Sequence, residues 1–233
     1  MKGKKQWILF YSLFSAVFLG MIFLGNRAVT VFSEERPVKR THCIIIDAGH
    51  GGVDGGATSC TGKLESAFNL EIALKLNDLM RLLGYETKMI RTSDISIYTE
   101  GESIAKKKIS DLKERVRIVN ETENGILISI HQNHFSDSRY SGAQVFYAKT
   151  AQSEQMAKEI QAAFLSTLNP GSRRSIKKAE GIYLMEHINC TGVLVECGFL
   201  SNAAEEAKLR SIPYQQNLCC VIASAICSFL SNT

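Results

Sequence analysis

Short apolar runs alternate with longer amphipathic segments along most of this 233-residue chain. The runs "CIIID" from Cys43 and "GILISI" from Gly125 are short and rich in β-branched residues, which predicts buried strands. Residues 65–83 carry apolar side chains at helical spacing and are followed by Gly84, a common helix terminator. Strands that alternate with helices indicate a mostly parallel sheet covered on both faces. We therefore expect a single three-layer α/β domain over residues 42–233.

The remaining elements follow from the same patterns. Further strands are expected at residues 85–91, 143–148 and 192–196, and further helices at 109–124, 153–168, 202–211 and 213–230. The polar stretch 92–108 has no clear periodicity, and residues 171–180 form a basic loop.

The N-terminus has the composition of a targeting segment. "MKGKK" precedes residues 7–25, which contain no charged side chain and approach the roughly 20 residues needed to span a bilayer. We expect a signal peptide or membrane anchor over residues 1–31, with the anchor slightly favoured by the length and the weak cleavage signal, and a polar linker over 32–41. The domain that follows is then expected outside the cytoplasm, secreted or membrane-anchored.

The composition excludes some classes of protein. The net charge of +4 is mild and comes partly from lysines in the N-terminal flank, so we expect no nucleic-acid partner. Seven cysteines are an odd number, and none has the C-x-x-C spacing of a structural zinc site. At least one thiol must therefore be unpaired within the chain.

Four polar side chains follow strands that are otherwise apolar, or open the next helix. His50 lies just after the first strand, His131 ends "GILISI", Glu196 ends "GVLVE", and Glu65 opens the first helix. In open α/β sheets, ligands bind beyond the carboxyl ends of the strands. These four residues are therefore expected to meet at one edge of the sheet.

The types of these four residues indicate a metal site. Two histidines and a carboxylate, with a water in the fourth position, form a known catalytic zinc set, and a second carboxylate can act as general base. We assign His50, Glu65 and His131 as ligands and Glu196 as base, although spacing alone leaves the roles of the two glutamates exchangeable. Zinc is favoured over magnesium because imidazole suits zinc.

Other motifs fail on spacing. "GHGGVDGG" does not fit the dinucleotide-binding G-x-G-x-x-G, and "GATSCTGKL" has Leu64 where a P-loop needs Ser or Thr. No G-x-S-x-G elbow is present. Cys197 is expected to face away from Glu196 because neighbours on a strand alternate, so it is a poor nucleophile candidate.

Two asparagines lie near the proposed ligands. Asn69 is four residues after Glu65 and shares its helix face, and Asn133 shares the strand face of His131. Each is a candidate for supporting the site or contacting a substrate, against the alternative of an ordinary surface residue.

Five motifs in order, "IIIDAGHGGVDGGA", "ESAFNLEIALKL", "IRTSD", "SIHQNH" and "GVLVECGFLSN", make the chain resemble the zinc-dependent N-acetylmuramoyl-L-alanine amidases, the amidase_3 family. The resemblance extends over nearly all of residues 43–230. A single catalytic domain behind a hydrophobic segment, without wall-binding repeats, is similar to the germination-specific amidases of spore-forming bacteria.

The resemblance implies a phosphorylase/hydrolase-like α/β fold and cleavage of the amide between N-acetylmuramic acid and L-alanine in peptidoglycan, in spore-cortex maturation. It makes His50, Glu65 and His131 zinc ligands and Glu196 the catalytic acid/base. It also implies peptidoglycan as substrate and places the protein outside the cytoplasm, with the forespore intermembrane space as one candidate compartment. The absence of wall-binding repeats suggests an activating or targeting partner protein.

Two rival functions stay open at this stage. A zinc carboxypeptidase acting on the stem peptide would present a cation to the terminal carboxylate. Arg174 in the basic loop is a candidate for that cation. In an amidase, the same arginine is a candidate for contacting the acidic stem peptide of the substrate. A non-catalytic wall-binding module is the second rival, and the intact set of four polar residues argues against it.

Overall fold

The computed structural model describes residues 41–232, and its centre is a six-stranded sheet. The strands are β1 (Cys43–Ala48), β2 (Glu86–Met89), β3 (Gly125–Asn133), β4 (Gln144–Tyr147), β5 (Lys177–Lys178) and β6 (Thr191–Phe199). They lie in the order β2-β1-β3-β6-β4-β5, and only the β4–β6 pair is antiparallel. The prediction of a mostly parallel sheet is therefore confirmed.

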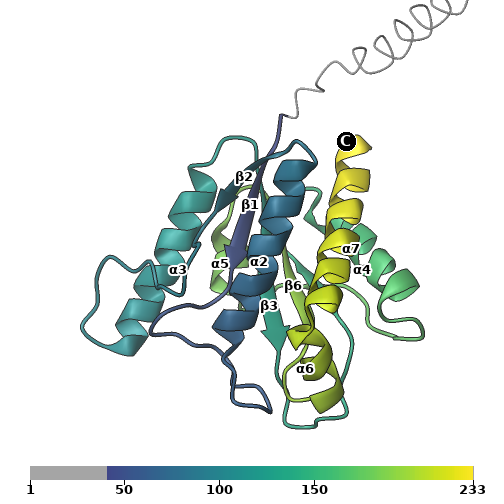
Figure 1. The fold of residues 1–233 in the computed structure, drawn as a ribbon. Helices are drawn as coiled ribbons and strands as arrows, with labels where there is room; N and C mark the ends of the chain where they lie inside the picture. Colours follow the sequence, from purple (N-terminus) through teal and green to yellow (C-terminus); the bar gives the residue numbers. More distant parts are fainter. Residues whose placement is uncertain (1–40, 233) are drawn as a thin grey trace, which may run out of the picture. The chain divides into compact units, whose positions relative to one another are not determined.

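Helices cover both faces of this sheet. They are α2 (Glu65–Leu82), α3 (Ile104–Asn120), α4 (Ser153–Thr167), α5 (Tyr183–His187), α6 (Ala203–Arg210) and α7 (Ile212–Ser231). The larger buried cluster joins one sheet face to α2, α4 and α7, and a smaller cluster joins the other face to α3 and α5. Figure 1 shows α2 and α7 in front of the strands, as the expected three-layer arrangement requires.

Alternation along the strands decides which side chains can share a site. In β6, Val195 and Cys197 pack in the larger cluster, whereas Leu194 packs in the smaller one. Since successive side chains of a strand point to opposite faces, Glu196 lies on the α3 and α5 face with Leu194. Cys197 therefore points away from Glu196, as the sequence predicts.

Several elements differ from the sequence prediction. Helix α3 covers 104–120 rather than 109–124, because Ser103 accepts a hydrogen bond from the Lys106 amide and starts the helix inside the polar stretch. Strand β6 continues to Phe199, so Glu196 lies within the strand rather than at its end. The five-residue helix α5 has no counterpart in the prediction, since it is too short to show a period.

The predicted N-terminal segments, residues 1–31 and nearly all of 32–41, lie outside the described residues. Thr41–Thr233 forms a compact unit of its own. Within residues 41–232, no helix combines the length and apolar character needed to cross a membrane.

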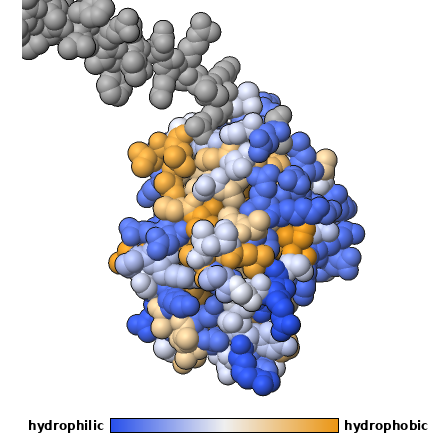
Figure 2. Space-filling model, turned by 90° about the vertical axis from the view of Figure 1, so that its right-hand side faces the viewer, coloured by the Kyte–Doolittle hydropathy of each residue, from blue (hydrophilic) through white to orange (hydrophobic). Residues whose placement is uncertain are grey.

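The outer surface of the helix layer is chemically mixed. Figure 2 shows the face on the α4 and α7 side, where hydrophobic residues gather in the upper part of the view among hydrophilic ones. All seven cysteines lie in the described part of the chain and are free thiols, so no disulfide stabilises this layer. Its stability comes from the apolar contacts that α2, α4 and α7 make with the sheet.

Candidate metal centre and active site

The turn after β1 presents His50 in an uncommon backbone conformation. His50 has a φ of 60°, in the left-handed region that non-glycine residues rarely adopt. Its ring atom Nδ1 lies 2.9 Å from Asp54 Oδ2 across the turn. This contact fixes the ring so that Nε2 faces Glu65, with 3.3 Å between Nε2 and Oε2.

Two glycines of this turn are required by close packing against the site. A Cβ on Gly49 would overlap the ring of His131. A Cβ on Gly56, whose φ is 68°, would lie 2.7 Å from both Glu65 Oε2 and His50 Cδ2. The glycine-rich composition of the turn thus lets backbone approach the two histidines and the glutamate directly.

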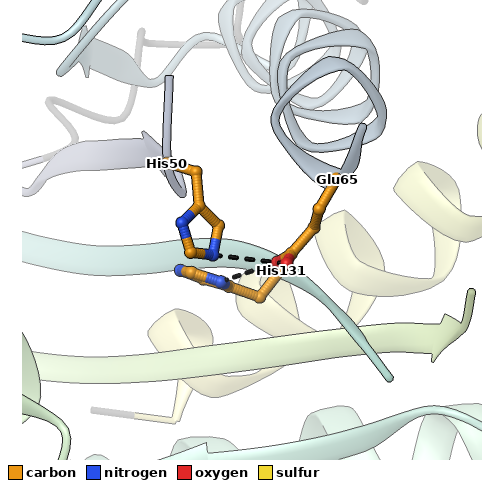
Figure 3. Close-up of side chains that lie close together, drawn as sticks. All are labelled: His50, Glu65 and His131. Carbon is orange, nitrogen blue, oxygen red and sulfur yellow. Dashed lines mark hydrogen bonds and ion pairs between the residues drawn. The ribbon is translucent and has the colours of Figure 1, made fainter. Parts of the chain in front are cut away.

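Helix α2 and strand β3 bring the other two predicted ligands to His50. Glu65 is the first residue of α2 and is nearly buried, and its Oε1 lies 3.0 Å from His131 Nδ1. One donor atom from each of His50, Glu65 and His131 lies within 4.8 Å of the other two. Figure 3 shows both imidazoles turned toward the glutamate carboxylate.

The electrostatics of this triad favour a cation between its members. Burial would lower the pKa of His50, but hydrogen bonds to Asp54 and Glu65 raise it to about 9. Burial would raise the pKa of Glu65, but hydrogen bonds from His131 and His50 hold it well below its ordinary value. Two imidazole nitrogens and one carboxylate oxygen form a donor set that fits a divalent transition metal.

Glu196 lies beside the triad without belonging to it. It is the register partner of His131 across the β3–β6 pair, and its side chain is on the same face of the sheet. Its Oε2 is buried and has no hydrogen-bond partner among residues 41–232. Burial raises the pKa of Glu196 to about 7, with Glu65 adding to the rise and His131 opposing it. A carboxyl group of this kind can accept and return a proton near neutral pH.

The other three candidate residues occupy different positions. Asn69 is fully buried, and its Nδ2 donates to Glu65 Oε1 at 3.2 Å and to the Gly49 carbonyl at 3.1 Å. Asn133 follows an irregularity in the β3–β6 register and is half-buried, with no side-chain hydrogen bond to any described residue. Arg174 lies further along the sheet, where it donates to Gln144 Oε1.

Two buried arginines, which the sequence reading did not select, hold the main chain of the His50 turn. Arg91 donates to the carbonyl oxygens of Ala48 and Gly49 at 2.7 and 3.0 Å. Arg115 donates to the carbonyls of Ala48 and His50 at 3.1 and 2.8 Å. Both side chains are 2% exposed, so the turn is clamped from inside the protein.

Arg115 is itself neutralised by two carboxylates. It pairs with Asp47 of β1, and its Nε donates to Asp111 Oδ2 of α3 at 2.6 Å. Asp47 also accepts from the Ser129 hydroxyl at 2.6 Å. Arg115 is therefore a buried structural residue whose charge is balanced inside the protein.

Asp54 is a further residue of the site that the sequence alone does not single out. A carboxylate that holds the far nitrogen of a ligating histidine is a recurrent feature of metal sites. Asp54 was visible as the acid four residues after His50, but spacing alone did not distinguish it from a turn residue.

A small cavity of about 90 Å³ opens onto the triad. Its lining includes His50 and His131 together with the apolar side chains of Ile182, Leu184 and Leu194. The site thus combines a polar centre with an apolar surface, as ligand sites commonly do.

Comparison with known proteins identifies relatives over the whole domain. The sequence profile of the N-acetylmuramoyl-L-alanine amidase family matches residues 44–228. The chain is 38% identical over 191 residues to the germination-specific N-acetylmuramoyl-L-alanine amidase of Bacillus subtilis (strain 168), and the match covers 81% of this chain and 79% of the relative. It is 30% identical to the amidase LytC of the same organism, with 74% of this chain and 32% of LytC covered.

Solved structures share the fold. The CwlD amidase from Clostridioides difficile, determined in complex with the GerS lipoprotein, superposes with a TM-score of 0.79 and 36% identity, covering 82% of this chain and all of that chain. The catalytic domain of the amidase CwlV from Bacillus (Paenibacillus) polymyxa superposes with a TM-score of 0.69 and 28% identity, covering 82% of this chain and 99% of that chain. The α/β fold with its mostly parallel sheet is therefore that of these amidases.

Proposed function

The chain belongs to the N-acetylmuramoyl-L-alanine amidase family, and from this membership we propose that it is a zinc-dependent hydrolase of the amide between N-acetylmuramic acid and L-alanine in peptidoglycan. The observation that carries the zinc assignment is the His50–Glu65–His131 cluster with Glu196 next to it. The donor set fits zinc better than magnesium, because two of its three ligands are imidazoles.

Zinc bound by these three side chains would supply Lewis acidity and make water nucleophilic near neutral pH. Glu196 is placed to accept the proton of the attacking water and to return it to the nitrogen of the leaving L-alanine. Its unpaired, buried oxygen and raised pKa support this role. Asp54 holds the tautomer and orientation of His50, and Asn69 holds the Glu65 carboxylate.

Asn133 is proposed as a substrate contact at the rim of the site. Its side chain is half-buried, follows His131 by two residues, and has no hydrogen-bond partner among the residues that the structure describes. Asn69, by contrast, is fully buried, which supports a role in positioning Glu65 rather than in touching a substrate.

The biological setting is proposed from the relatives. The similarity to a germination-specific amidase supports a role in spore-cortex peptidoglycan, and hence action outside the cytoplasm. The similarity to an amidase solved with a lipoprotein supports a partner protein that activates or targets this chain. The uncharged run over residues 7–25 supports a signal peptide or membrane anchor.

The test is product analysis on purified muropeptides with a Glu196→Gln variant. The zinc-loaded wild type is expected to release peptides that begin with free L-alanine, whereas loss of only a terminal amino acid would establish the carboxypeptidase alternative. Glu196→Gln is expected to keep one zinc per chain, measured by elemental analysis, and to lose turnover by at least about a hundredfold. Glu154→Gln, which removes only an exposed ion pair on α4, is the matched control. A Glu196→Gln protein without zinc would contradict the division of roles.

A further inference from the structure

A broad basic groove lies beside β4, the strand that pairs with β6. It has a volume of about 1070 Å³ and is lined by β4, the loop 168–177 and the start of α6. Its cationic lining residues are Arg139, Arg173, Arg174, Lys177 and Lys208. We propose that this groove binds the acidic stem peptide, with Arg174 pairing with the carboxylate of the residue that follows L-alanine. The inference rests on the proposed amidase function and assigns the substrate's peptide arm to a definite surface.

A row of polar side chains crosses the sheet from the metal centre to this groove. His131 of β3 is the register partner of Glu196 in β6, and Glu196 is directly opposite Gln144 in β4. Directly opposed residues of an antiparallel pair project on the same face with their Cβ atoms about 5 Å apart. Gln144 in turn accepts from Arg174 Nη1 at 2.8 Å. The Arg174 guanidinium therefore extends this row of polar groups beyond Gln144.

Arg174 is held rigidly in this position. Its Nε donates to the Ser141 carbonyl at 2.7 Å, and its guanidinium carbon lies 4.4 Å from the centre of the Phe199 ring. Gln144 is 3% exposed and is fixed by its own donation to the Ser175 carbonyl at 2.7 Å. Nη2 of Arg174 has no hydrogen bond to any described residue. A fixed guanidinium with a free N–H edge is suited to receive a carboxylate.

The charges around the groove are not neutralised within the described residues. Arg173, Lys177 and Lys208 form no ion pair with any residue in 41–232, and only Arg139 is paired, with Asp137. The single carboxylate in the lining, Glu205, is nearly buried and accepts from the amides of Gly142 and Phe199. The groove therefore presents a net positive surface that favours an anionic ligand.

The separation between the metal centre and Gln144 is on the scale of a short peptide. Neighbouring strands lie about 4.8 Å apart, so His131 and Gln144, two strand spacings apart, are separated by about 10 Å. Two extended residues span up to about 7 Å, and a side chain or carboxyl group extends this reach. A peptide whose scissile amide lies at the metal centre and whose arm crosses β6 thus directs the carboxylate of its second residue toward Arg174, whose long side chain covers part of the remaining distance.

The experiment compares two synthetic muramoyl tripeptides that differ only at the second residue, which carries a free α-carboxylate in one and a carboxamide in the other. The zinc-loaded full chain is expected to cleave the carboxylate form with a kcat/KM about tenfold higher, mainly through a lower KM. Arg174→Gln is expected to remove this preference. Arg174→Lys is expected to keep part of it, since a lysine has the positive charge but lacks the two parallel N–H donors of a guanidinium. Arg81→Gln, which removes an exposed charge at the end of α2, is expected to keep the preference.

The wild-type comparison tests the groove assignment without depending on the folding of a variant, and the Arg174 variants then test the partner of the carboxylate. Equal cleavage of the two tripeptides would overturn the groove assignment and leave the amidase function standing. Cleavage of neither would overturn the amidase function and this inference with it. A preference that Arg174→Gln retains in a folded protein would exclude Arg174 as the carboxylate partner.

Discussion

At the scale of the residue, the metal centre depends on how each imidazole is oriented as much as on which residues bind. His50 reaches Glu65 through Nε2 because Asp54 occupies Nδ1, whereas His131 faces Glu65 through Nδ1. The two histidines thus turn different nitrogens toward the same carboxylate. The sequence shows two histidines but cannot show which nitrogen each one offers, because this choice is set by contacts that form only in the fold.

Asp54→Asn is expected to weaken zinc binding by about 10- to 100-fold, the usual loss when the partner of a ligating histidine is changed. Competition with a chromogenic chelator measures the affinity, and activity is expected to return at excess zinc. Lys108→Gln is the matched control, because it removes the ion pair that Lys108 makes with Asp54 at 3.1 Å and leaves the carboxylate in place. Unchanged zinc affinity in Asp54→Asn would show that the turn alone orients His50.

At the scale of the element, β1 and the turn that follows it are fixed by side chains from outside them. Arg91 follows β2, and Arg115 comes from α3, yet both bind carbonyl oxygens in the short stretch from Ala48 to His50. The left-handed conformation of His50 is strained, and such strain persists only where the surroundings impose it. The two arginines supply that constraint.

Arg115→Met is expected to lower the free energy of unfolding by about 3–5 kcal/mol, because it leaves Asp47 buried beside an apolar side chain. Denaturant titration followed by circular dichroism measures the loss. Arg117→Gln on the exposed side of the same helix is the control, and its effect is expected within about 0.5 kcal/mol of zero. Equal stability of the two variants would mean that the buried pair contributes little.

Asp47 also predicts how stability changes in acid. Burial would raise its pKa, but Arg115 and the Ser129 hydroxyl outweigh burial and hold the pKa below its ordinary value, with His131 acting in the same direction. A depressed folded-state pKa gives stability that is fully present above the unfolded value near 3.9 and is lost as the pH falls through the folded value. Urea titrations between pH 6 and pH 3 are expected to show a steeper loss for the wild type than for Asp47→Asn. Parallel curves would contradict this assignment.

At the scale of the whole molecule, the sequence predicts the layers and the edge of the sheet where the site forms, because both depend on local periodicity. Residues 65–83 and 125–130 show strong patterns, and the elements lie where those patterns predict. Helix α5 is not predicted, because five residues are too few to show a helical spacing of apolar side chains. The start of α3 is not predicted, because its first turn is polar and shows no apolar face.

The proposed ligands of the site could be predicted from the sequence, but the buried residues that support them could not. His50, Glu65 and His131 lie together because each stands at an end of a predicted element, and sheet topology brings those ends together. The contact of Glu65 with both histidines, which spacing left open, is settled by the start of α2 beside the turn. Arg91 and Arg115 could not be selected, because a buried arginine and a surface arginine look alike in a sequence.

Removal of zinc is expected to destabilise the whole domain, since the three ligands come from three separate elements. A metal that binds only the folded state stabilises it by about 2.7 kcal/mol at one hundred times its Kd, which corresponds to a Tm shift of about 5–10 °C for a domain of this size. Scanning calorimetry with and without chelator measures the shift. Glu196→Gln is expected to keep it and His131→Ala to lose it, whereas a shift that survives in His131→Ala would place the metal elsewhere.

The position of β6 in the sheet has a consequence for the order in which the enzyme is made. The three proposed metal ligands all precede residue 132, whereas Glu196 comes 65 residues after His131, on a strand that lies between β3 and β4. A chain still emerging from the ribosome or a translocon can therefore gather its ligands long before it has a proton acceptor. The proposed catalytic centre is therefore complete only when β6 has been made and has joined the sheet, and we expect chains that end before residue 196 to lack hydrolytic activity.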